Sequence, residues 1–139
     1  MSDPNCIFCK IIAGEIPCHK IYEDNDTLAF LDIGPLSEGH CLVIPKEHYQ
    51  TIDEMPDELA GKCMSVVSKL SKVLKDAIGM TAWNVLQNNG SIAGQAVGHV
   101  HFHIIPRSSE DGLGYRWNSG ELSTDDAKRL IDTITQKLS

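Results

Sequence analysis

The sequence has few aromatic residues, no long hydrophobic run and no block of basic residues. Aromatic residues are 6% of the 139-residue chain. No apolar run reaches the roughly 18 residues of a membrane-spanning helix, so no membrane span is expected. With a net charge of −7 and scattered lysines and arginines, the chain is not expected to bind nucleic acid through its phosphates. The opening MSDPNCIFCK has neither a basic leader nor an apolar signal core, which predicts a cytoplasmic protein.

No internal repeat, low-complexity tract or linker divides the chain, so we expect one domain over residues 1–139. The hydrophobic pattern predicts an α+β fold. It indicates a long helix that begins near Asp57, a plausible cap, and ends at Gly79. Three helices are predicted: a short one within 8–17 that Gly14 and Pro17 stop, and two more over 56–79 and 123–138. Five strands are predicted over 20–25, 27–34, 39–46, 82–90 and 98–106. A sheet with the long helix across one face accommodates this order.

Three of the six histidines, His99, His101 and His103, alternate with apolar residues in GHVHFHIIPR. On a strand the three would share one face, and Val100, Phe102 and Ile104 would pack on the other, under the helix. The outer two would lie about 13 Å apart, too far to bind one zinc ion without strong inward leaning, since zinc–nitrogen bonds are about 2.0–2.1 Å. The row therefore suggests one metal ligand with two histidines free for chemistry, or simply polar residues on a solvated face.

A second feature is the CxxC pair Cys6 and Cys9 among five cysteines. In a cytosolic chain this spacing favours metal binding over a disulfide. A tetrahedral zinc site needs two more ligands, typically histidines. The candidates are His19, His40, His48, His99 and His103. The alternative is two free cysteines in a short helix.

HVHFHII resembles the signature of the histidine triad (HIT) family, His-x-His-x-His followed by two apolar residues. The resemblance extends through CIFCKIIAGEIP, YEDNDTLAFLDIGPLSEGHCLVIPKEH and NNGSIAGQAVG, over a core of about 5–117 followed by a C-terminal helix at about 124–138. It implies a five-stranded antiparallel sheet with one long helix and a shorter C-terminal helix. It also implies a homodimer whose two sheets join, and hydrolysis or transfer at the α-phosphorus of a purine nucleotide derivative such as a nucleoside phosphoramidate.

The resemblance also assigns roles to residues of the histidine row. His101 matches the family's nucleophile, and an imidazole suits this role because it is largely neutral at pH 7. It needs one ring N–H held by an acceptor, so that the other nitrogen's lone pair faces the substrate. The reaction would pass through a nucleotidyl-histidine, with His103 contacting the phosphate.

The other substrate-binding residues are likewise implied by the resemblance. Asn88 should donate to the phosphate or leaving group, Gln95 and the backbone near Gly94 and Ala96 should line the phosphate pocket, and Asp32 should accept from the ribose hydroxyls. Ile7, Phe8, Phe30 and Ile33 would enclose the base, although Phe8 and Phe30 equally fit an ordinary core. Ala96 departs from phosphoramidase members that carry a hydroxyl residue there to assist the leaving group.

A zinc-containing branch of the family resembles this chain in its N-terminal CxxC, which implies a structural zinc on Cys6, Cys9, His48 and His99. Two other functions remain open: a zinc-stabilised nucleotide-binding or partner-docking module, and a hydrolase with a zinc-bound water as nucleophile. Two further features are less defined. Arg107 would contact phosphate or a carboxylate, and segment 108–122, with Trp117, could fold over a partner's pocket.

Overall fold

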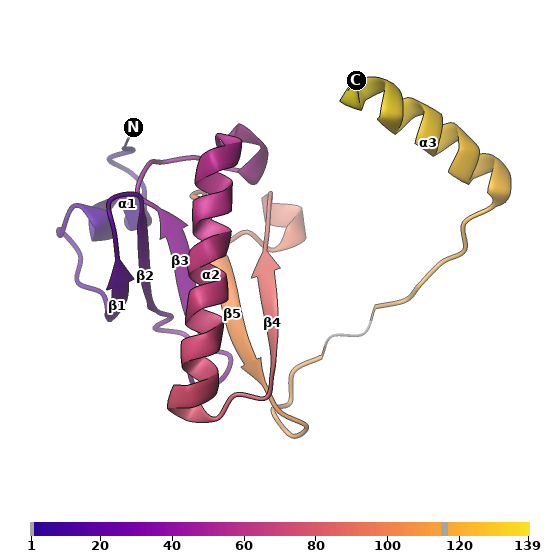
Figure 1. The fold of residues 1–139 in the computed structure, drawn as a ribbon. Helices are drawn as coiled ribbons and strands as arrows, with labels where there is room; N and C mark the ends of the chain where they lie inside the picture. Colours follow the sequence, from indigo (N-terminus) through magenta and orange to yellow (C-terminus); the bar gives the residue numbers. More distant parts are fainter. Residues whose placement is uncertain (1, 115–116) are drawn as a thin grey trace.

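The computed structural model describes residues 2–114 and 117–139, and its centre is one antiparallel sheet (Figure 1). Tyr115 and Arg116, within the segment predicted to fold over a partner's pocket, lie outside the described residues. The sheet order is β1-β2-β3-β5-β4, with every neighbouring pair antiparallel. The strands are β1 Lys20–Glu23, β2 Thr27–Leu31, β3 Cys41–Pro45, β4 Ala82–Gln87 and β5 Phe102–Arg107. The predicted α+β fold with five antiparallel strands is confirmed.

The long helix α2, Asp57–Ile78, lies across one face of this sheet (Figure 1). Its buried residues Val67 and Leu70 belong to one core with Val43 and Phe102, which are register partners on β3 and β5. Val100 and Ile104 join the same core, as the alternation of the histidine row predicts. The opposite face is therefore available to the histidines.

A second, smaller core covers the histidine face of the sheet. Helix α1, Ile7–Ile12, contributes Phe8, and the strands contribute Phe30 and Leu42. Leu42 pairs with His103 in the register of β3 and β5, so both point to this face. Cys6 and Cys9 belong to this core, which places the CxxC pair on the same side of the sheet as the histidines.

The predicted strand over 98–106 was wrong at its beginning, since β5 starts only at Phe102. His99 and His101 lie in the extended segment that leads into the strand. There the backbone N–H of Val100 donates to the Tyr49 carbonyl at 2.8 Å, outside the sheet ladder. Because His99 lies outside the ladder, its ring turns to the cysteines, whereas His103, inside β5, lies beside His40.

Helix ends differ slightly from their predictions. Asp57 is the first helical residue and not the cap, a position that Pro56 occupies without a side-chain hydrogen bond. Gly79 ends the helix in the left-handed conformation, at φ 68°, as predicted. Helix α1 ends at Ile12, before Gly14 and Pro17, because Ala13 already closes its last turn.

The C-terminal helix α3, Thr124–Leu138, stands apart from the sheet and from α2 (Figure 1). Ser123 caps it, its side chain accepting from the Asp126 N–H at 3.2 Å. The predicted shorter C-terminal helix is thus confirmed. No helix in the described part of the chain is long and apolar enough to cross a membrane.

Candidate active site and metal centre

His101 has one ring nitrogen fixed by the backbone. Its Nδ1 lies 2.7 Å from the carbonyl oxygen of His99. Because a carbonyl only accepts, the hydrogen of a neutral His101 is on Nδ1, and Nε2 carries the lone pair. The ring is 4% exposed, with Phe8 edge-on at 5.2 Å between centroids and His103 at 5.0 Å. His101 therefore has the tautomer that a nucleophile requires, and the backbone carbonyl of His99 fixes this tautomer.

His103 is fixed through a second histidine, His40. The Leu36 N–H donates to Nδ1 of His40 at 3.1 Å. A neutral imidazole has only one N–H, so the His40 hydrogen is on Nε2, which donates to Nδ1 of His103 at 2.9 Å. His103 therefore carries its own hydrogen on Nε2, where it is a donor. The two neighbouring histidines of the triad present opposite functions, a lone pair on His101 and an N–H on His103.

Burial keeps these imidazoles neutral. It lowers the pKa of His101, although the hydrogen bond to the His99 carbonyl opposes the shift. Burial, reinforced by the charges that His101 and His40 would carry, lowers the pKa of His103 to about 4. Burial also lowers the pKa of His40 against the opposing effect of the Asp32 carboxylate. At pH 7 the cluster consequently presents neutral rings with defined hydrogen positions.

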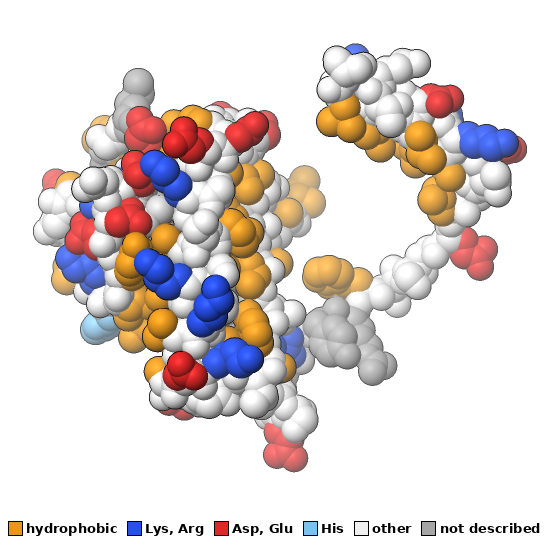
Figure 2. All heavy atoms as spheres, viewed as in Figure 1, with side chains coloured by type: hydrophobic (Ala, Val, Ile, Leu, Met, Phe, Trp, Pro, Cys, Tyr) orange, Lys and Arg blue, Asp and Glu red, His pale blue; other side chains and the backbone are white. Residues whose placement is uncertain are grey.

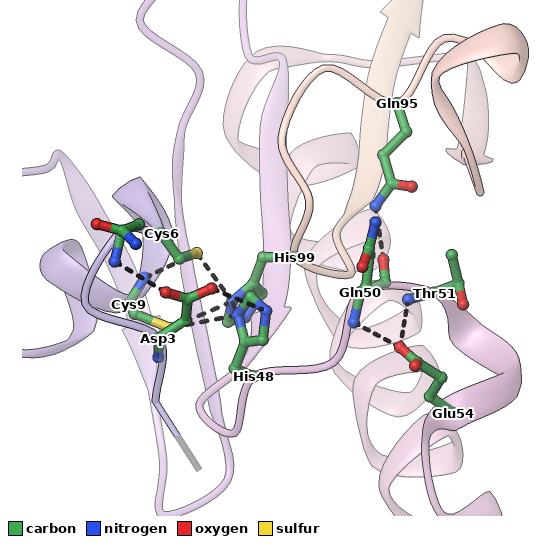
Figure 3. Close-up of polar contacts among 10 residues, drawn as sticks. Asp3, Cys6, Cys9, His48, Gln50, Thr51, Glu54, Gln95 and His99 are labelled. Atoms are coloured by element: carbon green, nitrogen blue, oxygen red, sulfur yellow. Dashed lines mark hydrogen bonds and ion pairs between the residues drawn. The ribbon is translucent and has the colours of Figure 1, made fainter.

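The four residues assigned to zinc from the resemblance converge in one cluster (Figure 3). Cys6 and Cys9 come from the start of α1, His48 follows β3 and His99 precedes β5. Nδ1 of His99 lies 3.4 Å from the Cys6 sulfur and 3.7 Å from the Cys9 sulfur. Nδ1 of His48 lies 3.4 Å from the Cys9 sulfur and 3.1 Å from Nδ1 of His99. A single ion could be held by all four.

These separations match the edges of a tetrahedron around zinc. With zinc–nitrogen bonds of about 2.0–2.1 Å and zinc–sulfur bonds of about 2.3 Å, the edges are about 3.3 Å between nitrogens and about 3.6 Å between nitrogen and sulfur. Nε2 of His99 lies 2.9 Å from the Pro45 carbonyl, which fixes its hydrogen there and directs the Nδ1 lone pair to the cluster. Burial raises the pKa of the Cys6 thiol, so a thiolate here needs a cation to stabilise it.

A second group of possible ligands comprises Asp32, His40 and His103. Its members are already explained by hydrogen bonding: His40 donates to His103, and Oδ2 of Asp32 lies 3.5 Å from Nε2 of His40. Oδ1 of Asp32 accepts from the Gly34 N–H at 2.8 Å. This places the carboxylate beside the catalytic candidates with both oxygens oriented. Its side chain is 23% exposed, so a ligand can reach it.

The glycine-rich loop after β4 is organised by Gln95. Its side-chain oxygen accepts from the Gly90 N–H and its nitrogen donates to the Gln50 carbonyl, both at 2.7 Å, and Figure 3 shows the latter contact. The amide is thus occupied in holding the loop. Asn88 lies beside Gly94 and donates to its carbonyl at 3.3 Å. Ala96 lines a surface cavity of about 310 Å³ with Ile7 and His48.

The apolar candidates divide into two groups. Phe8 and Phe30 are 7% and 4% exposed and pack edge-to-face, with centroids 5.6 Å apart, so both are core residues. Ile7 and Ile33 are exposed, Ile33 at 86%. Only the latter two present apolar surface that a base could cover.

Arg107 contacts a carboxylate. Its Nε lies 2.7 Å from Oδ2 of Asp111, and its other nitrogens donate to the Asn84 side chain and the Leu113 carbonyl. These contacts fix the turn after β5, so of the two predicted partners the carboxylate is confirmed. Trp117 is exposed and lines an apolar cavity with Leu86 and Ile105.

His40 was a candidate only for metal binding in the sequence. Its contact with His103 depends on β3 lying beside β5 and on the Leu36 N–H, and neither has a local sequence signal. The observation that could have pointed to it is its position one residue before the buried strand CLVIP.

The sheet, the fixed His101–His103 pair and the Cys₂His₂ cluster define a protein of the histidine triad type. The HIT domain family model matches residues 13–110. The chain is 50% identical over 135 residues to adenosine 5'-monophosphoramidase hnt1 of Schizosaccharomyces pombe, covering 96% of this chain and 98% of that one. The chain belongs to the HIT family.

Solved structures agree with this assignment. The crystal structure of a HIT family protein from Bacillus anthracis is 43% identical and has a TM-score of 0.93, covering 99% of this chain and 100% of that chain. A zinc-bound histidine triad family protein from Mycobacterium smegmatis is 32% identical with a TM-score of 0.75, covering 96% and 95% of the two chains.

Proposed function

We propose that the chain is a HIT-type nucleotide hydrolase that cleaves purine nucleoside phosphoramidates, or similar derivatives, at the α-phosphorus. The observation that carries the proposal is the 2.7 Å contact between Nδ1 of His101 and the His99 carbonyl. It leaves the Nε2 lone pair of a buried, neutral imidazole as the nucleophile. The similarity to an adenosine 5'-monophosphoramidase supports the substrate class.

The reaction has two displacements. Nε2 of His101 attacks the α-phosphorus, the phosphorus–nitrogen bond breaks, and the amine leaves with a proton taken up from the surroundings. Water then attacks the nucleotidyl-histidine, the phosphorus–Nε2 bond breaks, and a nucleoside monophosphate leaves. Alignment of a bound substrate can contribute about 7–11 kcal/mol to lowering the barrier.

The neighbouring residues bind the substrate in this proposal. The Nε2–H of His103 donates to a phosphate oxygen, with Asn88 and the loop backbone at Gly94, Gln95 and Ala96 around the same group. Asp32 accepts from the ribose hydroxyls, and Ile33 covers the base. Since the side chain of Gln95 is bonded within the loop, its contribution is to hold the loop backbone in place.

Turnover of adenosine 5'-monophosphoramidate to AMP tests this function. We expect His101→Ala to lower kcat by about 10³-fold or more, as loss of a covalent nucleophile does. His19→Ala is the matched control, because His19 is exposed and belongs to neither cluster. Normal turnover by His101→Ala would refute the mechanism. Binding of a nucleotide panel without turnover by the unaltered protein would instead favour the docking module.

We further propose that Cys6, Cys9, His48 and His99 hold a structural zinc ion. The tetrahedral separations and the zinc-bound relative support this site. Zinc there would cross-link α1 to the segments after β3 and before β5, and so stabilise the backbone that holds His101. Four protein ligands complete a tetrahedral shell, so this site has no position for a water nucleophile.

Metal content measured by mass spectrometry tests the zinc site. We expect about one zinc per chain, as for a closed Cys₂His₂ site. Cys9→Ser and His48→Ala should lose most of it and lower the melting temperature. Cys18→Ser is the matched control, since Cys18 lies outside the cluster. Full zinc content in Cys9→Ser would exclude this ligand set.

The same proposal includes a homodimer in which two sheets join at β4. This strand is the outer one of the described sheet beside β5, so its second edge has no neighbouring strand there. Exposed Val85 and Leu86 on β4 favour coverage by another chain.

A further inference from the structure

Helix α3 has an apolar face that packs against no other element in the described part of its own chain. Ala127, Leu130, Ile131, Ile134 and Leu138 recur at the three- and four-residue spacing of one helical face. None of the residues of α3 is buried, and Ile131 and Ile134 are 58% and 55% exposed. Figure 2 shows apolar side chains gathered along one side of the helix. A 15-residue helix is marginal alone in water, so this face needs a partner.

The position of α3 is shared with a crystallised relative. The superposition on the Bacillus anthracis protein covers 99% of this chain and therefore most of α3. Residues 118–139 are about one sixth of the chain. If they lay elsewhere in the relative, the remaining residues could not reach the TM-score of 0.93. The helix thus stands off the sheet at the same place in that crystal structure, which favours a second chain that holds it there.

A second uncovered apolar surface lies on the body of the chain. On the β4 side, a cavity of about 480 Å³ is lined mainly by apolar residues: Leu36, Val85, Leu86, Ile105, Leu113 and Trp117. Monomeric proteins rarely expose both an open sheet edge and an unpartnered amphipathic helix. A second copy of the chain carries both surfaces as well. In a two-fold dimer, the α3 of each copy can therefore cover the apolar cavity of the other, because every contact is made twice.

We propose that α3 docks through this face on the body of a second copy of the chain, and that the two copies exchange their helices reciprocally. This inference rests on the homodimer proposed above but not on its chemistry. The exchange makes α3 part of the interface, so its helical structure depends on association.

Isotope-filtered NMR on the full-length protein tests the exchange. Chains with ¹³C-labelled isoleucine methyls are mixed with unlabelled chains and allowed to re-equilibrate. We expect Ile131 and Ile134 methyls to show NOEs to protons of the unlabelled chain. A dimer in which their NOEs are only intrachain would overturn the exchange and leave the homodimer intact. A monomer at NMR concentration would overturn both.

A pair of variants on opposite faces of α3 provides the control. Ile134→Glu and Gln136→Glu each introduce one carboxylate, on the apolar and the polar face respectively. We expect Ile134→Glu to raise the dimer dissociation constant at least about tenfold, as loss of a buried interface residue does, and Gln136→Glu to leave it unchanged. Equal effects of the two variants would contradict the proposed face. Analytical ultracentrifugation gives both constants, and phosphoramidate turnover reports on the chemistry separately.

Discussion

The tautomer of His103 depends on one residue, His40, which does not itself need to touch the substrate. Replacing His40 by leucine removes the N–H that donates to Nδ1 of His103 at 2.9 Å. His103 is then free to place its hydrogen on Nδ1, and its Nε2 no longer donates to the phosphate. We expect kcat to fall about 10- to 100-fold, a loss of about 1.4–2.7 kcal/mol of transition-state stabilisation, with little change in KM.

A conservative variant separates this positioning effect from a packing effect. The amide nitrogen of glutamine can reach near the place of Nε2 of His40, so His40→Gln should recover much of the lost kcat. If His40→Gln and His40→Leu are equally impaired, or if only KM rises, His40 does not position His103.

His103 also makes stability depend on pH. Its pKa is about 4 in the folded chain and near 6.5 when unfolded. Between these values the unfolded chain binds a proton that the folded chain does not, so the free energy of unfolding falls as pH drops from about 6.5 towards 4. One such proton contributes a slope of at most about 1.4 kcal/mol per pH unit.

Urea titrations of the wild type and His103→Gln at pH 4.5 to 8.5 measure this slope, at one fixed protein concentration. The variant should have the shallower dependence on pH, and the two curves should run parallel above pH 7. Identical slopes would show that His103 titrates normally in the folded protein.

Among the elements, the junction between the loop before β3 and the end of α2 leaves no room for a side chain at Gly39. Its φ is +89°, and an added Cβ would lie 2.6 Å from Cδ1 of Ile78 and 3.3 Å from the Pro106 ring. Gly14 has a similar φ of +81° and open space around it. Gly14→Ala thus reports the backbone strain alone, about 1–2 kcal/mol.

We expect Gly39→Ala to destabilise the protein by about 1–2 kcal/mol more than Gly14→Ala, because Ile78 must move from its place. Chemical denaturation of both variants gives the difference. Equal destabilisation by Gly39→Ala and Gly14→Ala would mean that the Ile78 side chain moves aside without loss of stability.

The elements also show what local sequence can predict. Alternation placed Val100 and Phe102 in the core under α2 and the histidines on the other face, because the period of two persists even where His99 and His101 lie outside the ladder. The CxxC spacing pointed to a metal, but the residues alone left five histidines open. Only the fold brings His48 and His99 within 3.1 Å of one another, and the resemblance anticipated this pair.

Contacts between distant segments were beyond local prediction. The bond from His40 to His103 requires the β3–β5 register, and the two hydrogen bonds of the Gln95 side chain require the loop to be closed already. The His40–His103 bond and the Gln95 bonds both depend on the positions of backbone groups, which a pattern of side chains does not predict.

At the scale of the whole molecule, the backbone connects the two histidine clusters. His99 directs its ring to the cysteine cluster, and its carbonyl holds the ring of His101. A metal bound there would therefore stabilise the nucleophile without contacting the substrate. In the proposed mechanism, His101 forms a covalent bond to phosphorus.

The stereochemical outcome at phosphorus tests that claim most directly. An adenosine phosphoramidothioate of known configuration, hydrolysed in ¹⁸O-labelled water, gives a product whose configuration can be assigned by ³¹P NMR. Two in-line displacements through His101 invert the configuration at phosphorus twice, so we predict net retention. Net inversion would contradict a covalent bond to His101, since a single direct attack by water would then perform the reaction.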